Sequence, residues 1–389
     1  MLGSCFKPPP KSTAEILLCV GLRFGPDALN SHISLHAWKT LSPGTWNRAF
    51  NEHGQLRLDN VLNRIRRGGV DPSIRAEVWE FLLGCFGPSS TTQQRDSLRA
   101  SRREQYAKLK SECQLMDNLI GSGQIATSPR INADGSLAEE CNGGEISGGN
   151  EISHHQNGHM NGAYQQTSIA PYEKQCKKTI QWRLNLHQIG LDVVRTDRML
   201  QFYASQEHMS KLWDILAVYC WLDPAIGYCQ GMSDFCSPLA LMFQDEADAF
   251  WCFERIMSRL RDNFSCTDKE VGVEKQLAVL ATLLKVLDPK LHEHIDSIKG
   301  GDYIFAFRMI MVLFRREFSF VDTLYLWEMD TLPWLQNYMP YGVGLGTRGL
   351  DEVLKLLNDV TGKVDPKEVC KSALKLHSEY LRRVGVLFL

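Results

Sequence analysis

The sequence lacks a long apolar run, an excess of either charge and any closely spaced pair of cysteines. No stretch reaches the roughly 18 uninterrupted apolar residues that a membrane-spanning helix requires, so any membrane contact is peripheral or made through a partner. Lys and Arg total 43 against 45 Asp and Glu, and the net charge of -2 provides no field that would gather nucleic acid or anionic lipid. The 12 cysteines include no Cys-x-x-Cys pair, and several lie within apolar helical patterns, which indicates reduced thiols in the cytosol.

The first residues, MLGSCFKPPPK, also lack a recognisable targeting signal. Their apolar stretch is too short for a secretory signal, and Gly3 stands one position too late for myristoylation. We expect Cys5 to be an unmodified thiol rather than a palmitoylation site. The protein is therefore expected to be cytoplasmic.

What the chain does contain is enough apolar sequence for a large core. Its 389 residues are 44% hydrophobic and 23% charged, as in a soluble globular protein. Residues 1–60 mix Pro, Gly and Ser without sustained periodicity, and we interpret them as a partly ordered leader. Residues 61–389 are interpreted as one large helical domain.

Helical signals dominate this second part of the chain. Four Asp-Pro pairs, at 71, 223, 288 and 365, combine a capping side chain with a residue suited to a first helical position, and we expect three or four of them to open helices. Apolar residues recur at intervals of three to four along three stretches. These stripes are Leu212, Ile215, Leu216, Tyr219 and Leu222; Val273, Leu277, Leu280, Leu284 and Leu287; and Tyr303, Phe307, Ile310, Met311 and Phe314. Because strict alternation is scarce, the predicted fold class is all-α.

One segment, at about residues 121–172, interrupts this pattern. It is poor in aliphatic residues and rich in Gly, Asn and Ser, so burial cannot offset its ordering entropy, and we expect a disordered insertion. His154, His155 and His159 lie within it, but no carboxylate or cysteine stands at ligand spacing in an ordered frame. We therefore predict no metal site.

Arg75 and Trp79 form the first of three segments with chemical potential. Asp71 caps a helix whose first residue is Pro72, and the spacing of four then places Arg75 and Trp79 on one side. Taken alone, this pair is typical of an arginine stacked on a tryptophan in a structural corner.

The second segment holds Ile189, Asp192 and Arg195 at successive steps of three. On a helical turn the three side chains share a face, so Ile189 anchors the turn while Asp192 steadies the guanidinium of Arg195. The competing interpretation is an ordinary surface ion pair of almost no energetic value.

The third segment, GYCQGMSDF, begins at Gly227 and lies between two apolar runs. Tyr228 supplies a bulky anchor, and Gly231 clears space beside Gln230. The amide of Gln230 offers a donor and an acceptor, which is what orienting a water against a phosphoryl group requires. Alternatively, Gln230 satisfies backbone groups at the start of a helix.

Taken together, these segments resemble a known family. Arg75 with Trp79, then Ile189-x-x-Asp192-x-x-Arg195, then Tyr228-x-Gln230 are similar, in this order, to the three signature motifs of the TBC domain of Rab GTPase-activating proteins. Residues 303–328 also look like the later helices of that domain, and the resemblance covers roughly residues 66–383 apart from the insertion. It implies a multi-helix TBC domain of two helical subdomains.

The resemblance also implies a mechanism in which two side chains enter the nucleotide site of a GTP-bound Rab protein. Arg195 would act as an arginine finger, and Gln230 as a glutamine finger. Asp192 would hold Arg195, while Ile189, Tyr228, Gly231, Arg75 and Trp79 would support the two fingers. The chain would then have no reaction and no cofactor of its own, because GTP and Mg²⁺ arrive on the Rab partner. Recruitment to endomembranes would occur indirectly, through that partner.

Several alternatives are weighed against this assignment. Arg198 lies one turn beyond Arg195, but only Arg195 has an aspartate three positions before it. Gly344, Gly346 and Gly349 match a dinucleotide fingerprint of an oxidoreductase, but two prolines and no buried strand precede them. The remaining alternative is a non-catalytic effector or scaffold that binds a GTP-loaded Rab protein.

Overall fold

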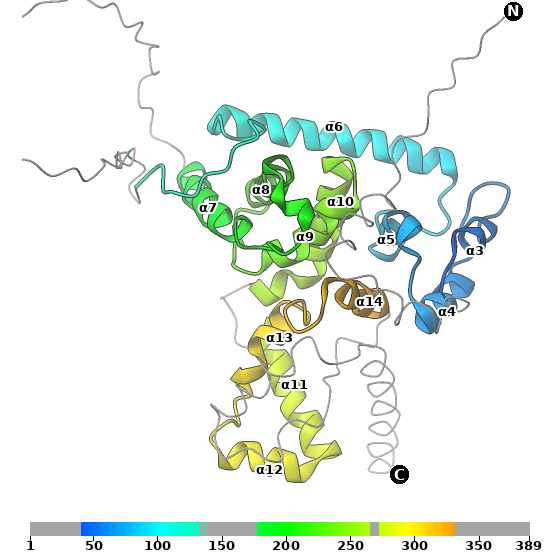
Figure 1. Ribbon diagram of the computed structural model, residues 1–389, viewed down its shortest axis with the longest axis vertical. Coiled ribbons are helices and arrows are strands. Elements are labelled where there is room, and N and C mark those ends of the chain that lie inside the picture. Colours follow the sequence, from blue (N-terminus) through cyan, green and yellow to red (C-terminus); the bar gives the residue numbers. More distant parts are fainter. Residues whose placement is uncertain (1–39, 133–135, 137–176, 265–271, 331–389) are drawn as a thin grey trace, which may run out of the picture.

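The computed structural model describes residues 40–132, 136, 177–264 and 272–330 (Figure 1). Within these ranges all regular structure is helical, apart from isolated β-bridges between Leu41 and Val70 and between Phe50 and Leu56. The prediction of an all-α fold is thus confirmed. The helices are α3 (Pro43–Arg48), α4 (Leu58–Gly68), η1 (Pro72–Ile74), α5 (Arg75–Leu82), α6 (Thr92–Met116), α7 (Lys177–Val193), η2 (Gln201–Ala204), α8 (Gln206–Leu222), α9 (Met232–Met242), α10 (Glu246–Leu260), η3 (Arg261–Phe264), α11 (Gly272–Leu287), α12 (Pro289–Ser297), η4 (Ile304–Ala306), α13 (Phe307–Met311) and α14 (Phe320–Asp330).

The larger subdomain is built around α8, which packs against α6, α7, α9 and α10 (Figure 1). Every residue of α8 from 212 to 220 is buried, as expected of a helix that is apolar nearly all round. The predicted stripe on this helix is confirmed except at its end, where Leu222 is 40% exposed. This central helix and its neighbour α9 flank the loop that carries Gln230.

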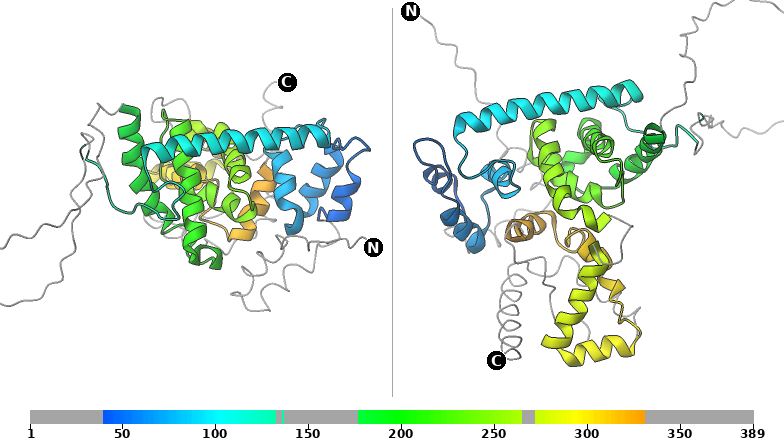
Figure 2. Two further views of the ribbon diagram at one scale, coloured as in Figure 1. Left: turned by 90° about the horizontal axis from the view of Figure 1, so that it is seen from above. Right: turned by 180° about the vertical axis from the view of Figure 1, so that it is seen from behind.

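The smaller subdomain consists of α11, α12, η4 and α13, which Figure 2 shows as an arm projecting away from the larger body. Its separate core includes Val273, Leu277, Leu280 and Leu284 of α11, so these members of the predicted stripe are confirmed. The expected division into two helical subdomains is therefore observed.

The third predicted stripe, from Tyr303 to Phe314, does not form one continuous helix. Only residues 304–311 are helical, as the short elements η4 and α13. Tyr303, Leu313 and Phe314 have φ angles of 57°, 45° and 59°, in the left-handed region that a continuing helix excludes. The apolar spacing identified residues such as Ile310 as buried, but tertiary contacts bend the backbone on both sides of α13.

The Asp-Pro pairs open helices in two of the three places that the structure describes. Asp71 caps η1, which leads directly into α5, and Asp288 caps α12. Asp223 instead ends α8 and begins a turn, with its carboxylate 2.8 Å from Nε of Arg261. Asp223 is therefore the exception among the described pairs, and the fourth pair lies outside the described residues.

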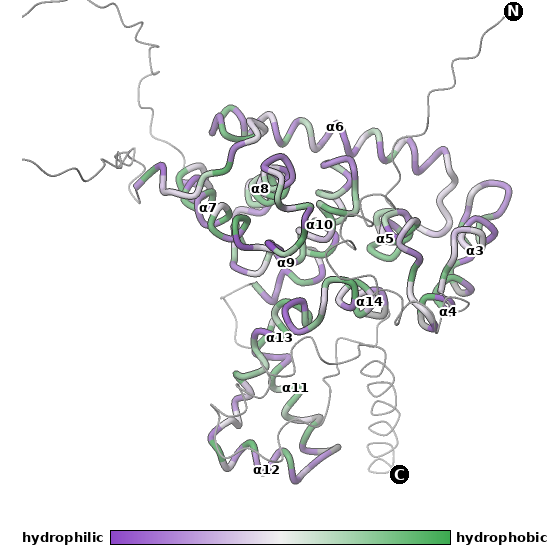
Figure 3. Tube along the Cα trace, viewed as in Figure 1, coloured by the Kyte–Doolittle hydropathy of each residue, from purple (hydrophilic) through white to green (hydrophobic). Residues whose placement is uncertain are grey.

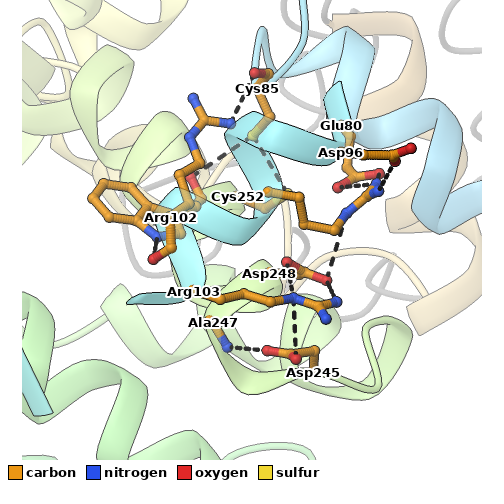
Figure 4. A network of polar contacts seen from close by, with 11 residues as sticks. Glu80, Cys85, Asp96, Arg102, Arg103, Asp245, Ala247, Asp248 and Cys252 are labelled. Carbon is orange, nitrogen blue, oxygen red and sulfur yellow. Dashed lines mark hydrogen bonds and ion pairs between the residues drawn. The ribbon is translucent and has the colours of Figure 1, made fainter. Parts of the chain in front are cut away.

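The long helix α6 lies across α8 and α10 (Figures 1 and 2). Most of its residues are hydrophilic (Figure 3). Only Tyr106 and Cys113 of its 25 residues are buried. Ion pairs also join it to the bundle: Arg99 lies 2.8 Å from Glu80 of α5, and Arg103 lies 2.5 Å from Asp248 of α10 (Figure 4). They add to the burial of Tyr106 and Cys113 in the larger core.

The expected leader and the expected insertion both include described residues that are buried. Trp46, within the expected leader, is 1% exposed and donates a hydrogen bond to Glu77 of α5. Ala126 and Ile131, within the expected insertion, are 5% and 3% exposed. Residues 137–172 of that insertion, with its three histidines, lie outside the described residues. Within the described part of the chain, no helix has both the length and the hydropathy needed to cross a membrane.

Candidate functional site

The end of α7 presents Arg195 to solvent from a buried base. Ile189 is fully buried and Asp192 is 6% exposed, both within α7. Arg195 stands just beyond the helix, and its side chain is 58% exposed. Its Nη2 atom donates to Oδ1 of Asp192 at 2.5 Å. The spacing of three thus places an anchor, a carboxylate and an exposed guanidinium in the predicted order.

The loop between α8 and α9 presents Gln230 to solvent from a similarly buried base. Gln230 is exposed, whereas Gly231 is buried and begins α9 with φ 106°, in the region that favours glycine. A Cβ atom on Gly231 would lie 3.0 Å from Cγ1 of Val312, so this glycine also permits close packing against the segment after α13.

Tyr228 joins these two segments. Its hydroxyl donates to Oδ2 of Asp192 at 2.6 Å, while Oδ1 of the same carboxylate accepts from Arg195. Burial raises the pKa of Tyr228 well above its usual value, and the adjacent negative charge of Asp192 adds to this effect. The phenol therefore stays protonated and remains a donor. One buried carboxylate thus orients the guanidinium of Arg195 and anchors the loop of Gln230.

A second contact connects the same two segments, from the residue after Arg195 to the first turn of α9. The hydroxyl of Thr196 lies 2.9 Å from the hydroxyl of Ser233 in α9. Arg198, the competing arginine, is exposed and donates instead to the sulfur of Met209 at 3.7 Å. The structure thus gives Arg195, and not Arg198, the carboxylate support expected from the spacing.

Arg75 and Trp79 are both buried in α5, and a residue far along the chain joins them. Nε of Arg75 lies 2.5 Å from Oε1 of Glu328 in α14, and the indole of Trp79 donates to the same oxygen at 3.3 Å. The other carboxylate oxygen of Glu328 accepts from the backbone of Val70 at 3.0 Å. The sequence interpretation missed Glu328, whose only signal is a charge inside the apolar pattern of residues 320–328.

A chain of aromatic rings connects this buried ion pair to the Gln230 segment. Trp79 contacts Trp327 with ring centroids 6.3 Å apart, and Trp327 stacks on Phe235 of α9 at 5.3 Å. Phe235 lies on the first turns of the helix that Gly231 begins. Arg75 and Trp79 therefore support the site through α14 and α9, without contacting Asp192.

Two further arginines, Arg315 and Arg316, contact the segments that carry Arg195 and Gln230, and the sequence interpretation also missed them. Arg315 binds Asp197, and Arg316 binds Asp234. Their signal in the sequence is a pair of charges that follows directly on the apolar stripe ending at Phe314.

The arrangement suits the stabilisation of a negatively charged group supplied by another molecule. It offers one exposed guanidinium and one exposed carboxamide on rigid, buried supports. In the described ranges, no group of three or more His, Cys, Asp or Glu side chains has the geometry of a metal site. The glycines at 344, 346 and 349 lie outside those ranges.

Comparisons with known proteins give a consistent result. The family model described as Rab-GTPase-TBC domain matches residues 150–338. The chain is similar to Rab GTPase-activating protein 22 of Arabidopsis thaliana, with 30% identity over 362 residues that cover 74% of this chain and 66% of the relative. It is also similar to TBC1 domain family member 17 of Homo sapiens, with 28% identity over 396 residues that cover 97% of this chain and 51% of the relative. The chain thus spans about half to two thirds of the length of these relatives.

Among solved structures, the chain resembles the crystal structure of the Ypt/Rab-GAP domain of Gyp1p. The TM-score is 0.59 with 16% sequence identity, and the match covers 87% of this chain and 98% of that chain. At this identity the likeness concerns the fold. It agrees with the multi-helix fold that the sequence motifs imply.

Proposed function

The chain belongs to the Rab-GTPase-TBC domain family, and on this premise we propose that it accelerates GTP hydrolysis by a Rab-family small GTPase in its GTP-bound state. One observation carries the proposal: the carboxylate of Asp192 binds both Arg195 and Tyr228. Because Tyr228 precedes Gln230 by two residues, one buried group supports two exposed polar side chains. An ordinary surface ion pair would not use a buried carboxylate that also binds a second side chain.

In this proposal Arg195 is the arginine finger. Its guanidinium would offset the charge that develops on the γ-phosphoryl group during transfer to water, a role worth about 10³ to 10⁵ in rate when supplied in trans. Asp192 fixes the orientation of the guanidinium before the partner binds, so little side-chain freedom is lost on binding.

Gln230 is the glutamine finger of the same proposal. A carboxamide can accept a hydrogen bond from the attacking water and donate one to a phosphate oxygen. The left-handed backbone at Gly231 turns the chain into α9 directly after Gln230, which leaves this side chain at the exposed tip of the loop.

The proposed active site is composite. GTP and Mg²⁺ arrive on the Rab partner, and the chain contributes side chains but no cofactor of its own. Rab proteins carry lipid anchors, so the chain would reach endomembranes from the cytoplasm through its partner.

The test is GTP hydrolysis by a panel of GTP-loaded Rab proteins, with the full chain added in trace amounts. We expect acceleration of at least one Rab protein, and a loss of about 10³-fold in Arg195→Ala. Arg198→Ala, which removes an exposed arginine without carboxylate support, should retain most of the activity. Binding of a GTP-loaded Rab protein with unchanged hydrolysis would instead identify the chain as an effector or scaffold.

A further inference from the structure

The turn that follows α13 contacts both finger-bearing segments at once. This turn, residues 313–317, carries the adjacent arginines Arg315 and Arg316 and leads towards α14. Leu313 and Phe314 adopt the left-handed conformation, which non-glycine residues retain only where their surroundings enforce it. One such constraint is visible, because the indole of Trp327 donates to the carbonyl of Leu313 at 2.9 Å.

Arg315 binds the turn that carries Arg195. Its Nη2 atom lies 2.5 Å from Oδ1 of Asp197, and its side chain is only 7% exposed. Asp197 stands two residues after Arg195 and is itself left-handed, with φ 49°. The second oxygen of Asp197 accepts from the hydroxyl of Ser237 in α9 at 2.5 Å. The turn after Arg195 is thus fastened to two elements through one carboxylate.

Arg316 binds the segment that carries Gln230. Its Nη2 and Nε atoms lie 2.8 Å and 3.3 Å from the two oxygens of Asp234, a bidentate geometry. Asp234 stands in the first turn of α9, four residues after Gln230. Proximity of Asp234 also raises the pKa of Arg316, as expected of a stable charge pair. Val312, directly before the turn, packs against Gly231.

We propose that Arg315 and Arg316 are positioning residues that hold the Arg195 and Gln230 segments in one fixed arrangement. The inference rests on the proposed function, since fixed fingers matter only to a catalytic activator. Neither arginine needs to reach the nucleotide, because each acts through an aspartate on a finger-bearing segment. Displacement of a catalytic group by about 1 Å can cost about 10²-fold in rate, so these contacts are sufficient to control activity.

The competing interpretation of Arg316 is a half-exposed ion pair without consequence, because such pairs contribute little to stability. This makes Arg316 the more decisive residue to change, since its loss should leave the protein folded. A matched control exists in Arg103. The side chains of Arg103 and Asp248 are 45% and 14% exposed, and the nitrogen–oxygen distance of the pair is 2.5 Å. The side chains of Arg316 and Asp234 are 37% and 14% exposed, and the corresponding distance is 2.8 Å.

The experiment uses the full chain and a Rab protein whose GTP hydrolysis the wild type accelerates. Arg316→Gln should lower the maximal rate about 10-fold and change the half-saturating concentration by less than about twofold. Arg316→Lys should restore part of the rate, and Arg103→Gln should change neither quantity. Combining Arg316→Gln with Asp234→Asn should cost no more than the slower single variant, because both remove one interaction.

Asp197→Asn tests the Arg315 side of the turn without emptying a buried position. It keeps the shape of the side chain and weakens the pair with Arg315, so a similar fall in maximal rate is expected. A wild-type maximal rate in both Arg316→Gln and Asp197→Asn would overturn the inference. The inference would also be overturned if the variants' lower rate equalled the wild-type rate once it was expressed per folded molecule.

A second readout does not depend on activity. In the free protein, amide hydrogen exchange should become faster within residues 192–200 in Asp197→Asn and within residues 228–236 in Arg316→Gln, and stay unchanged in Arg103→Gln. If no Rab protein responds to the wild type, the proposed function fails. Faster exchange would then still support the positioning of the two segments by Arg315 and Arg316. Unchanged exchange in both variants would show that the two arginines do not position these segments.

Discussion

Tyr228 donates a 2.6 Å hydrogen bond to Asp192 across 36 residues of sequence. The two residues belong to separate motifs, one supporting Gln230 and the other supporting Arg195. Asp192 is only 6% exposed, so its carboxylate is hydrogen-bonded by Tyr228 and Arg195 in place of water. The two exposed side chains therefore share one internal support.

Tyr228→Phe should impair the proposed activity while keeping the aromatic packing. A hydrogen bond to a charged group contributes about 1.5–3 kcal/mol, so we expect the maximal acceleration to fall about 10- to 100-fold. The measurement is single-turnover GTP hydrolysis of a responsive Rab protein at saturating activator. Tyr106→Phe is the control, since it removes a hydrogen bond from α6 to Glu246 of α10 that involves neither Arg195 nor Gln230. Equal rates for Tyr228→Phe and wild type would show that the shared support is dispensable.

Glu328→Gln should destabilise the whole domain. The carboxylate is bound by Arg75, Trp79 and the backbone of Val70, and the side chains of Arg75 and Glu328 are 7% and 0% exposed. Neutralising one partner leaves a buried charge uncompensated, which costs about 3–5 kcal/mol of unfolding free energy. Urea denaturation measures this loss, and Arg103→Gln should cost less than about 1 kcal/mol in the same assay. A similarly small loss in Glu328→Gln would contradict the prediction.

Glu80 should make stability depend on pH. Burial raises the pKa of Glu80 to about 7, and the attraction of Arg99 does not fully offset the lost hydration. The folded state thus binds this proton more tightly than the unfolded state does. The free energy of unfolding that this proton contributes is fully present below pH 4.5, the pKa of Glu80 in the unfolded state. It is lost as the pH rises to about 7, the pKa in the folded state.

Glu80→Gln cannot ionise, so its stability relative to the wild type should increase as the pH rises from about 5 to 7, by at most about 1.4 kcal/mol per pH unit. Urea midpoints at each pH provide the measurement. Asp96→Asn, which removes an acidic side chain that is 67% exposed and 3.7 Å from the same Arg99, should give a nearly constant difference. A constant difference for Glu80→Gln as well would argue against a raised pKa.

Gly190→Ala should displace the segment that follows α6. A Cβ atom at Gly190 would lie 1.7 Å from the carbonyl oxygen of Ala126, and neither backbone can accommodate that contact unchanged. Such overpacking costs about 1–3 kcal/mol, and trypsin should cut faster at Arg130. Gly87→Ala, where a Cβ atom would meet nothing within 4 Å, is the matched control. Unchanged cleavage would mean that residues 121–132 do not depend on this contact.

The sequence predicted the local parts of the site well. Asp192 lies in the last turn of α7 and Arg195 stands two residues beyond its end, and their spacing of three is short enough to predict the pair. The same reasoning placed Arg75 and Trp79 on one side of α5. In each case the residues are separated by less than two turns, and short-range spacing fixes which side chains lie on one side.

The contacts that join distant segments were not predictable in this way. Glu328 is 253 residues from Arg75, and Arg315 is 118 residues from Asp197. No periodicity encodes such pairs, because their geometry depends on how whole helices pack. The break in the stripe from Tyr303 to Phe314 has the same origin, since left-handed residues there are imposed by tertiary contacts. The assignments of a leader at 1–60 and an insertion at 121–172 stay predictions.

The contact between Arg316 and Asp234 bears on how the protein is made. Ribosomes synthesise the chain from its N-terminus, so Arg195 and Gln230 exist well before residue 316 is added. A nascent chain, or a product truncated before that position, would carry all three signature motifs and still lack the turn that joins the Arg195 and Gln230 segments. Arg195 and Gln230 can therefore reach their final arrangement only late in translation.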